Sequence, residues 1–190
     1  MPGRAGGELV VQSESDREWM RSRSTRVDQR KVRVLLIEDD PEDVMLVERS
    51  LGRPSVPSHP FTLDHAAVLQ EGLDRLAKGD TDGILLDLDL PDSRGVDTVV
   101  RVRERDSEVP IVVFTMSGDD DTAMRALEAG AQDYLVKGEL NGSLLRRSIR
   151  YAIERQRTRR RDAQLQDRRL RALKLESLGV LAGGVAWGLE

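Results

Sequence analysis

Five short apolar runs alternate with amphipathic stretches between residues 32 and 136, and this alternation constrains the fold more than any other feature of the sequence. The runs are Val32 to Ile37, Phe61 to Ala66, Ile84 to Leu88, Ile111 to Thr115 and Tyr134 to Val136. The stretches with helical spacing are Pro41 to Leu51, Val68 to Lys78, Val96 to Arg105 and Asp120 to Ala129. Strands and helices that alternate in this way form a parallel sheet with helices on both faces. We therefore predict an α/β protein with a doubly wound, five-stranded parallel sheet.

The charge of the chain divides it into segments. Residues 31–138 hold 12 basic and 23 acidic groups, whereas residues 139–190 hold 12 basic and 6 acidic groups, so the total of −4 conceals an acidic body and a basic tail. Residues 1–30 are polar and have little to bury. We predict a disordered or loosely ordered leader over 1–30, a folded domain over 31–140 and a long helical extension over 141–190.

The extension lacks proline, and its only early interruption is Gly142. Alternate steps of four and three residues from Leu145 define a seam that is apolar at both ends and polar in the middle: Leu145, Ile149, Ala152, Gln156, Arg159, Ala163, Gln166, Leu170, Leu173, Ser177 and Val180. This spacing predicts a coiled coil that makes the protein a homodimer, with a frayed hinge at Gln156 to Arg161. The alternative is a solvated, charged single helix.

Composition excludes several classes of protein. The chain has no cysteine, no secretory signal and no apolar run of membrane-spanning length, so we expect a soluble, cytoplasmic protein without a membrane partner. Aromatic residues make up only 3% of the chain, no helix-turn-helix pattern follows the folded body, and the arginines of the tail are mixed with acids and glutamine. We do not expect nucleic acid to be a partner.

Polar residues stand at the carboxyl ends of the strongest predicted strands. Glu38 and Asp39 follow the first strand, Asp87 lies in the third, Thr115 ends the fourth and Lys137 follows the fifth. In a doubly wound sheet, ligands bind at this edge, where the winding reverses. Carboxylates gathered there repel one another unless a cation such as Mg²⁺, which prefers oxygen ligands, relieves the repulsion. The pattern indicates a Mg²⁺-dependent site for a phosphoryl group.

The order and spacing of these residues resemble a response-regulator receiver domain over about Lys31 to Arg155. The motifs that carry the resemblance are Glu38-Asp39, Asp87 in Leu-Leu-Asp-Leu, Thr115 in Ile-Val-Val-Phe-Thr, and Tyr134 and Lys137 in Asp-Tyr-Leu-Val-Lys. The resemblance implies the flavodoxin-like receiver fold. It also implies a role in two-component signalling, with a sensor histidine kinase or a phosphotransfer protein as partner.

The resemblance assigns the metal ligands and the phosphoacceptor. Asp87 would accept the phosphoryl group, and Glu38 and Asp39 would hold Mg²⁺ together with Asp87. Asp39 would be the direct ligand of the acidic pair, and the backbone carbonyl of Asp89 would supply a further oxygen.

Three other positions acquire roles from the same resemblance. Lys137 would pair with the phosphoryl group, and Thr115 would donate a hydrogen bond to it. Tyr134 would be the switch aromatic that turns inward when Thr115 moves.

The other acidic residues and the two histidines have simpler explanations. We predict that the acids are helix caps rather than ligands, because negative charge suits a helix N-terminus, and that His59 and His65 are surface or packing residues. The acids are Asp40, Asp43, Asp92 and the run Asp119 to Asp121.

Three positions depart from the usual receiver pattern: Met116, the acidic side chain of Asp89, and Gly138 in the place where proline is frequent. We expect the three to tune the rate of the reaction and the lifetime of the phosphoryl group. A cis peptide bond after Lys137 is also less expected with glycine than with proline.

Residues 174–186 resemble the approach to the phosphoacceptor histidine in the dimerisation helix of histidine kinases, but Trp187 stands where the histidine would be. An indole cannot serve as a phosphohistidine. We therefore expect a signalling domain without kinase activity, which is phosphorylated only from a phosphodonor. The alternatives are the N-terminal regulatory part of a receiver-containing histidine kinase, and a phosphate sink or partner-binding regulator.

Overall fold

The computed structural model of the protein describes residues 31–52, 61–116, 118–139 and 141–185, with side chains described as far as Lys174. The predicted leader, His59 and Trp187 lie outside the described residues.

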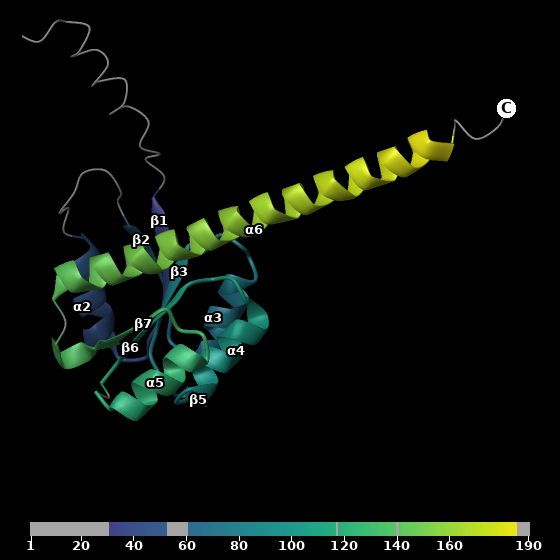
Figure 1. The fold of residues 1–190 in the computed structure, drawn as a ribbon. Helices are drawn as coiled ribbons and strands as arrows, with labels where there is room; N and C mark the ends of the chain where they lie inside the picture. Colours follow the sequence, from purple (N-terminus) through teal and green to yellow (C-terminus); the bar gives the residue numbers. More distant parts are fainter. Residues whose placement is uncertain (1–30, 53–60, 117, 140, 186–190) are drawn as a thin grey trace, which may run out of the picture.

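A five-stranded parallel sheet forms the centre of the protein (Figure 1), as the alternating pattern predicts. Its strands follow the order β2-β1-β3-β6-β7, the order of flavodoxin-like folds, so the winding reverses between β1 and β3. The strands are β1 (Val32–Ile37), β2 (Phe61–Ala66), β3 (Gly83–Leu86), β6 (Ile111–Thr115) and β7 (Asp133–Val136).

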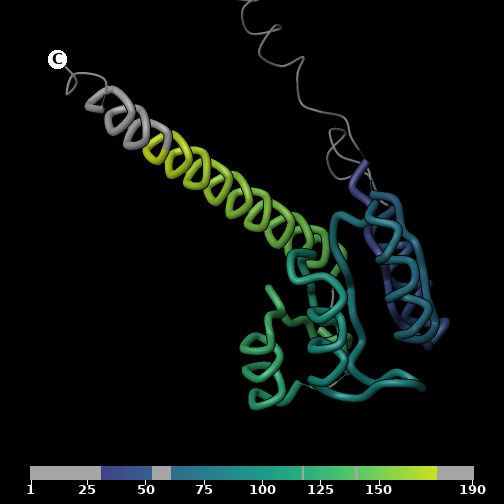
Figure 2. Tube along the Cα trace, turned by 90° about the vertical axis from the view of Figure 1, so that its right-hand side faces the viewer, coloured from purple at the N-terminus to yellow at the C-terminus, as the bar shows by residue number. Residues whose placement is uncertain are grey.

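Helices cover both faces of the sheet (Figures 1 and 2). Three helices pack on one face: α3 (Leu69–Leu76), α4 (Asp97–Arg105) and α5 (Asp120–Glu128). Two pack on the other: α2 (Pro41–Gly52) and α6 (Gly142–Val185). The four helices predicted from the sequence are thus confirmed, and each of their ends lies within two residues of the predicted position.

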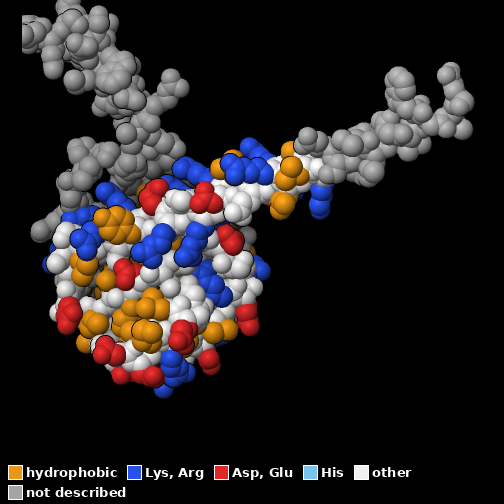
Figure 3. Space-filling view, viewed as in Figure 1, with side chains coloured by type: hydrophobic (Ala, Val, Ile, Leu, Met, Phe, Trp, Pro, Cys, Tyr) orange, Lys and Arg blue, Asp and Glu red, His pale blue; other side chains and the backbone are white. Residues whose placement is uncertain are grey.

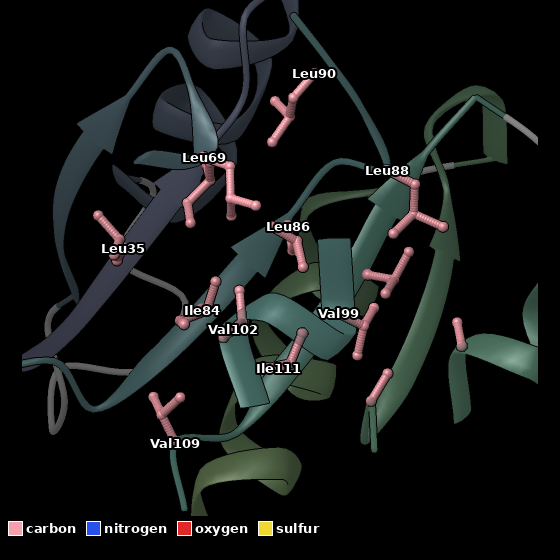
Figure 4. Packing of buried hydrophobic residues seen from close by; sticks show 14 of the residues in the cluster. Leu35, Leu69, Ile84, Leu86, Leu88, Leu90, Val99, Val102, Val109 and Ile111 are labelled. Carbon is pink, nitrogen blue, oxygen red and sulfur yellow. The ribbon is translucent and has the colours of Figure 1, made fainter. Parts of the chain in front are cut away.

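The core divides at the sheet because successive residues of a strand point to opposite faces. In β1, Leu35 belongs to the cluster that packs against α3 and α4 (Figure 4), whereas Val34 and Leu36 belong to the cluster beneath α2 and α6. Strands that are buried on both faces need apolar residues at nearly every position. The runs of β1, β3 and β6 have this property, whereas β2 and β7, at the two edges of the sheet, are only partly buried and include polar residues.

Two features differ from the sequence predictions. The third strand ends at Leu86 rather than Leu88, so Asp87 lies in the loop that follows it, and a short hairpin of β4 (Asp89–Leu90) and β5 (Ser93–Arg94) comes next. Strands of two residues leave no periodic signal. In addition, the turn η1 (Lys137–Glu139) separates β7 from α6.

The predicted hinge at Gln156 to Arg161 is wrong, because α6 is one continuous helix from Gly142 to Val185. Polar contacts stabilise this stretch where the helix leaves the sheet: Gln156 donates a hydrogen bond of 2.8 Å to Glu108, and Arg157 pairs with Asp82 at 3.2 Å. None of the helices in the described part of the chain has the length and apolarity needed to cross a membrane.

Candidate functional site

The strand order brings the acidic residues together. β1 and β3 are parallel neighbours in which Ile37 pairs with Leu86, so the residues that follow them, Glu38 and Asp87, emerge side by side at the switch point. Backbone hydrogen bonds hold both: the Asp87 N–H donates to the Ile37 carbonyl at 3.0 Å, and the Glu38 N–H donates to the Ala66 carbonyl at 3.0 Å.

Glu38, Asp39 and Asp87 form a carboxylate cluster at this edge. One carboxylate oxygen from each residue lies within 4.8 Å of those of the other two. Glu38 is fully buried and Asp87 is 5% exposed, whereas Asp39 is open to solvent. The sequence prediction that these three side chains share a site therefore agrees with their positions.

Lys137 is buried among the carboxylates. Its Nζ atom lies 2.6 Å from Glu38, 2.8 Å from Asp43 and 2.9 Å from Asp87. Burial alone lowers the pKa of Lys137, but its bonds to Asp43, Glu38 and Asp87 outweigh burial and leave the pKa raised. The lysine is therefore held in its charged form beside Asp87.

One ammonium group does not balance all the negative charge. Burial, together with the charge of Asp87, raises the pKa of Glu38 to about 7, even though Lys137 and the Asp40 N–H act in the opposite direction. A divalent cation with oxygen ligands would relieve this repulsion, so the carboxylates of Glu38, Asp39 and Asp87 fit Mg²⁺.

Asp43 belongs to the site, although its position near a helix start led us to predict a cap. Side chains of a helix tilt toward its N-terminus, and this tilt directs Asp43 from the first turn of α2 back to Lys137. In the sequence, only its place in the first turn after Pro41 distinguished Asp43. The distance to Lys137 depends on how α2 packs on the sheet.

Three of the acids predicted to be caps do cap helices. Asp40 accepts a hydrogen bond of 2.8 Å from the Glu42 N–H at the start of α2, and Asp119 accepts one of 3.0 Å from the Thr122 N–H of α5. Asp92 caps α3 from a distant loop, through the N–H groups of Leu69 at 2.7 Å and Gln70 at 2.9 Å.

His65, predicted to be a surface or packing residue, is half-buried on β2. Its Nε2 atom lies 2.8 Å from the backbone carbonyl of Glu38, so the imidazole contacts the main chain of the site rather than its carboxylates.

Thr115 and Tyr134 lie on neighbouring strands beside the cluster. Thr115 is 4% exposed at the end of β6 and pairs in register with Val136, directly before Lys137. Tyr134 is half-buried on β7 against the core beneath α5. The two residues thus lie on the fourth and fifth strands of the chain, where the sequence pattern predicted them.

The three unusual positions also have defined surroundings. The side chain of Asp89 is exposed and pairs with Arg94 at 3.3 Å, while its N–H lies 3.3 Å from an Asp87 oxygen. Met116 is 70% exposed next to the site. Gly138 lies in η1, and none of the described peptide bonds is cis.

Solved structures share this fold. A two-component response regulator of the LuxR family from Aurantimonas sp. SI85-9A1 has a TM-score of 0.57 at 26% identity, over 66% of this chain and 86% of that one. The signal receiver domain of an HD domain-containing protein from Pseudomonas fluorescens Pf-5 has a TM-score of 0.61 at 22% identity, over 70% and 93% of the two chains.

Curated relatives match the same region of the chain. Response regulator protein PilR of Pseudomonas aeruginosa is 34% identical over 105 residues, which are 55% of this chain and 22% of PilR. Cell cycle transcriptional regulator CtrA of Caulobacter vibrioides is 36% identical over 106 residues, 56% of this chain and 44% of CtrA. The chain thus covers less than half of either relative. The family model of the response regulator receiver domain matches residues 34–150, and the chain belongs to that family.

Proposed function

We propose that the protein is a cytoplasmic two-component receiver that accepts a phosphoryl group on Asp87 in a Mg²⁺-dependent reaction. The observation that carries the proposal is the buried Asp87 carboxylate, bonded to Lys137 and next to the acidic pair Glu38 and Asp39. The phosphodonor would be the phosphohistidine of a sensor histidine kinase or of a phosphotransfer protein.

The groups around Asp87 suit an in-line displacement at phosphorus. The Leu88 N–H donates a hydrogen bond of 2.6 Å to Oδ1 of Asp87 and orients the carboxylate. A carboxylate lone pair forms the new bond to phosphorus while the bond to the donor's nitrogen or oxygen breaks, and the leaving group keeps that electron pair. The product is an acyl phosphate.

Positive charge beside Asp87 lowers the barrier to this reaction. Lys137 neutralises charge that develops on the transferred oxygens, because its ammonium group is already held 2.9 Å from Asp87. A Mg²⁺ ion held by Glu38, Asp39, Asp87 and the Asp89 carbonyl would supply further electrostatic stabilisation. Thr115 would donate a hydrogen bond to the bound phosphoryl group, and Tyr134 would turn inward in response.

Asp87→Asn tests the assignment directly. We expect labelled acetyl phosphate with Mg²⁺ to phosphorylate the unmodified chain, and the Asp87→Asn variant to incorporate almost no label, because an amide cannot form the acyl phosphate. Asp74→Asn, at an exposed position on α3, is the matched control and should be labelled normally. Equal labelling of the Asp87→Asn variant, or no labelling of the unmodified chain, would show that the site is misassigned.

For output, we propose that two copies pair through α6. The buried seam residues Leu145, Ile149 and Ala152 pack on the receiver, and the same seam continues along the projecting part of the helix to Leu170 and Leu173, which are both 59% exposed. A helix with exposed leucines at seam positions is stabilised by a partner helix. The dimer would transmit the phosphorylation state of Asp87 onward.

A second candidate rests on the sequence of residues 174–186. Their similarity to a histidine-kinase dimerisation helix supports a regulatory role at the N-terminal side of a kinase, with Trp187 in the place of the phosphoacceptor. Mixing the protein with a labelled partner kinase separates a receiver or phosphate sink from a partner-binding regulator. Transfer of label to Asp87 with unchanged kinase activity supports a receiver or phosphate sink, and a change in kinase activity without transfer supports a partner-binding regulator.

A further inference from the structure

A groove of about 980 Å³ lies between α6 and the body of the receiver, at the edge of the sheet opposite Asp87. Its walls include Ser107 and Glu108, which precede β6, and Gly130 to Gln132, which precede β7. Asp87 and Lys137, in contrast, follow their strands. The groove is therefore separate from the candidate phosphorylation site.

Hydrogen bonds from one arginine hold together the wall of the groove on the receiver body. Arg103 on α4 donates hydrogen bonds to the carbonyls of Gly130 at 2.7 Å and Val109 at 2.5 Å, and thereby joins the two loops. Gly130 has a φ of +108°, and a Cβ there would lie only 2.8 Å from Nε of Arg103, so glycine is required. These bonds hold the two loops together in the wall of the groove that faces α6.

The other wall is α6, which remains straight after it leaves the sheet. Arg155, Arg159 and Ala163, spaced four residues apart, line the groove from one side of the helix. Within the described residues, neither Arg155 nor Arg159 pairs with a carboxylate, whereas Arg160 pairs with Glu108 at 3.3 Å.

The groove is therefore positively charged with a small apolar part. Four arginines line it, Arg103 and the three on α6, against the single acid Glu108, and its apolar contributions come from Leu127, Ala131 and Ala163. Figure 3 shows basic side chains along the described part of α6, interspersed with a few acidic ones, and acidic side chains mainly around the lower rim of the body. Such a surface favours an anionic segment that carries a few apolar side chains.

The chain contains one segment of this kind outside the described residues. Residues 8–20 hold four acids and one arginine, with apolar side chains at each end in Leu9 to Val11 and in Trp19-Met20. We propose that this segment docks in the arginine groove of its own chain, with its carboxylates on Arg155 and Arg159 and its apolar side chains against Leu127 and Ala131.

The length of the tether permits this docking. β1 begins at Val32, at the same edge of the sheet as the groove, because all five strands are parallel. Residues 21–31 between the segment and β1 span up to about 36 Å when extended. A tether of this length gives an effective concentration on the order of millimolar, so even a weak contact is occupied.

Trp19 can report docking in the full-length chain. Trp19 and Trp187 are the only two tryptophans, so Trp187→Phe leaves Trp19 as the single indole fluorophore. We expect its emission to be blue-shifted and protected from acrylamide, and we expect Arg155→Glu with Arg159→Glu to abolish both effects. The matched control is Arg168→Glu with Arg169→Glu, which makes the same charge change at exposed positions of α6 beyond the groove and should leave both effects intact.

A charge reversal on the segment separates docking from a general disturbance of the fold. Glu14→Lys, Asp16→Lys and Glu18→Lys together should expose Trp19, and their combination with Arg155→Glu and Arg159→Glu should restore its protection. Solvent-exposed Trp19 in the parent, equal effects of the groove and control pairs, or no restoration would each overturn the proposal. Protection that is lost on dilution would indicate the leader of a second copy and would overturn docking within one chain.

Discussion

Lys137 carries the charge balance of the candidate site, because its ammonium group lies within 2.9 Å of carboxylate oxygens from Glu38, Asp43 and Asp87. Its side chain is only 4% exposed, so bulk water solvates these carboxylates poorly and they depend on the lysine for a positive partner. Burial, reinforced by the charge of Asp87, raises the pKa of Glu38 to about 7, so this carboxylate is costly to keep charged even beside the lysine.

We therefore expect Lys137→Ala to lower the free energy of unfolding by about 3 kcal/mol in Mg²⁺-free buffer, because carboxylates are left buried without a partner. Added Mg²⁺ should recover part of this loss by neutralising the same groups. Urea unfolding with and without Mg²⁺ measures both effects. Lys78→Ala, at an exposed position, is the control, and the reasoning fails if the two variants are equally stable.

Packing between elements depends on small residues that no charge pattern reveals. Gly72 brings α3 against β1 so closely that an added Cβ would lie 2.4 Å from Cδ1 of Ile37, which is fully buried. Glycine within a helix would ordinarily be unfavourable. Here the close approach of helix and sheet requires it.

Gly72→Ala should consequently lower the free energy of unfolding by about 1–3 kcal/mol through overpacking, despite the better helix propensity of alanine. Ile37→Val removes the crowded methyl group and should recover part of the loss when both changes are combined. Gly52→Ala, where a Cβ meets nothing within 4 Å, serves as the control in the same unfolding experiment. A Gly72→Ala variant more stable than the parent would contradict the packing argument.

The stretch where α6 leaves the sheet is a second feature that depends on contacts between elements. The sequence predicted a hinge because polar residues interrupt the seam, but Gln156 is 8% exposed and bonded to Glu108, and Arg157 pairs with Asp82. Partners in two loops far away in the sequence determine the outcome. Local polarity alone could not reveal them.

Glu108→Gln combined with Asp82→Asn should weaken these contacts and increase amide hydrogen exchange around residues 156–160, because local opening requires fewer polar bonds to break. Hydrogen exchange read by mass spectrometry tests this, with Asp80→Asn, an exposed acid in the same loop as Asp82, as the control. Exchange that is unchanged in the double variant would mean that helix propensity alone maintains the stretch.

At the scale of the whole molecule, α6 projects beyond the receiver (Figures 1 and 2) and its side chains are exposed from Thr158 to Lys174. Most of the stability of helices in proteins comes from packing of one face. The proposed dimer would provide that packing for the projecting part, through Leu170 and Leu173.

Leu170→Ser with Leu173→Ser should therefore weaken self-association by more than about tenfold, because burial of a leucine contributes about 1.5–3 kcal/mol. Leu165 is also exposed, at 52%, but lies about 140° around the helix from Leu170 and off the seam. Leu165→Ser should leave association unchanged. Sedimentation velocity over a range of concentrations distinguishes the variants, and a parent that is monomeric throughout would exclude the dimer.

The sequence by itself determined the parallel sheet, the positions of its five strands and the edge where Glu38, Asp39, Asp87, Thr115 and Lys137 meet. These properties depend on the local alternation of apolar runs and on the rule that the carboxyl ends of parallel strands meet at one edge of a sheet. Both follow from the order of residues along the chain. Only the tertiary structure placed Asp43 against Lys137, brought Ile37 close to Gly72, kept α6 continuous through Gln156 and formed the arginine groove. Each of these depends on distances between residues remote in sequence, which arise only when helices pack on the sheet.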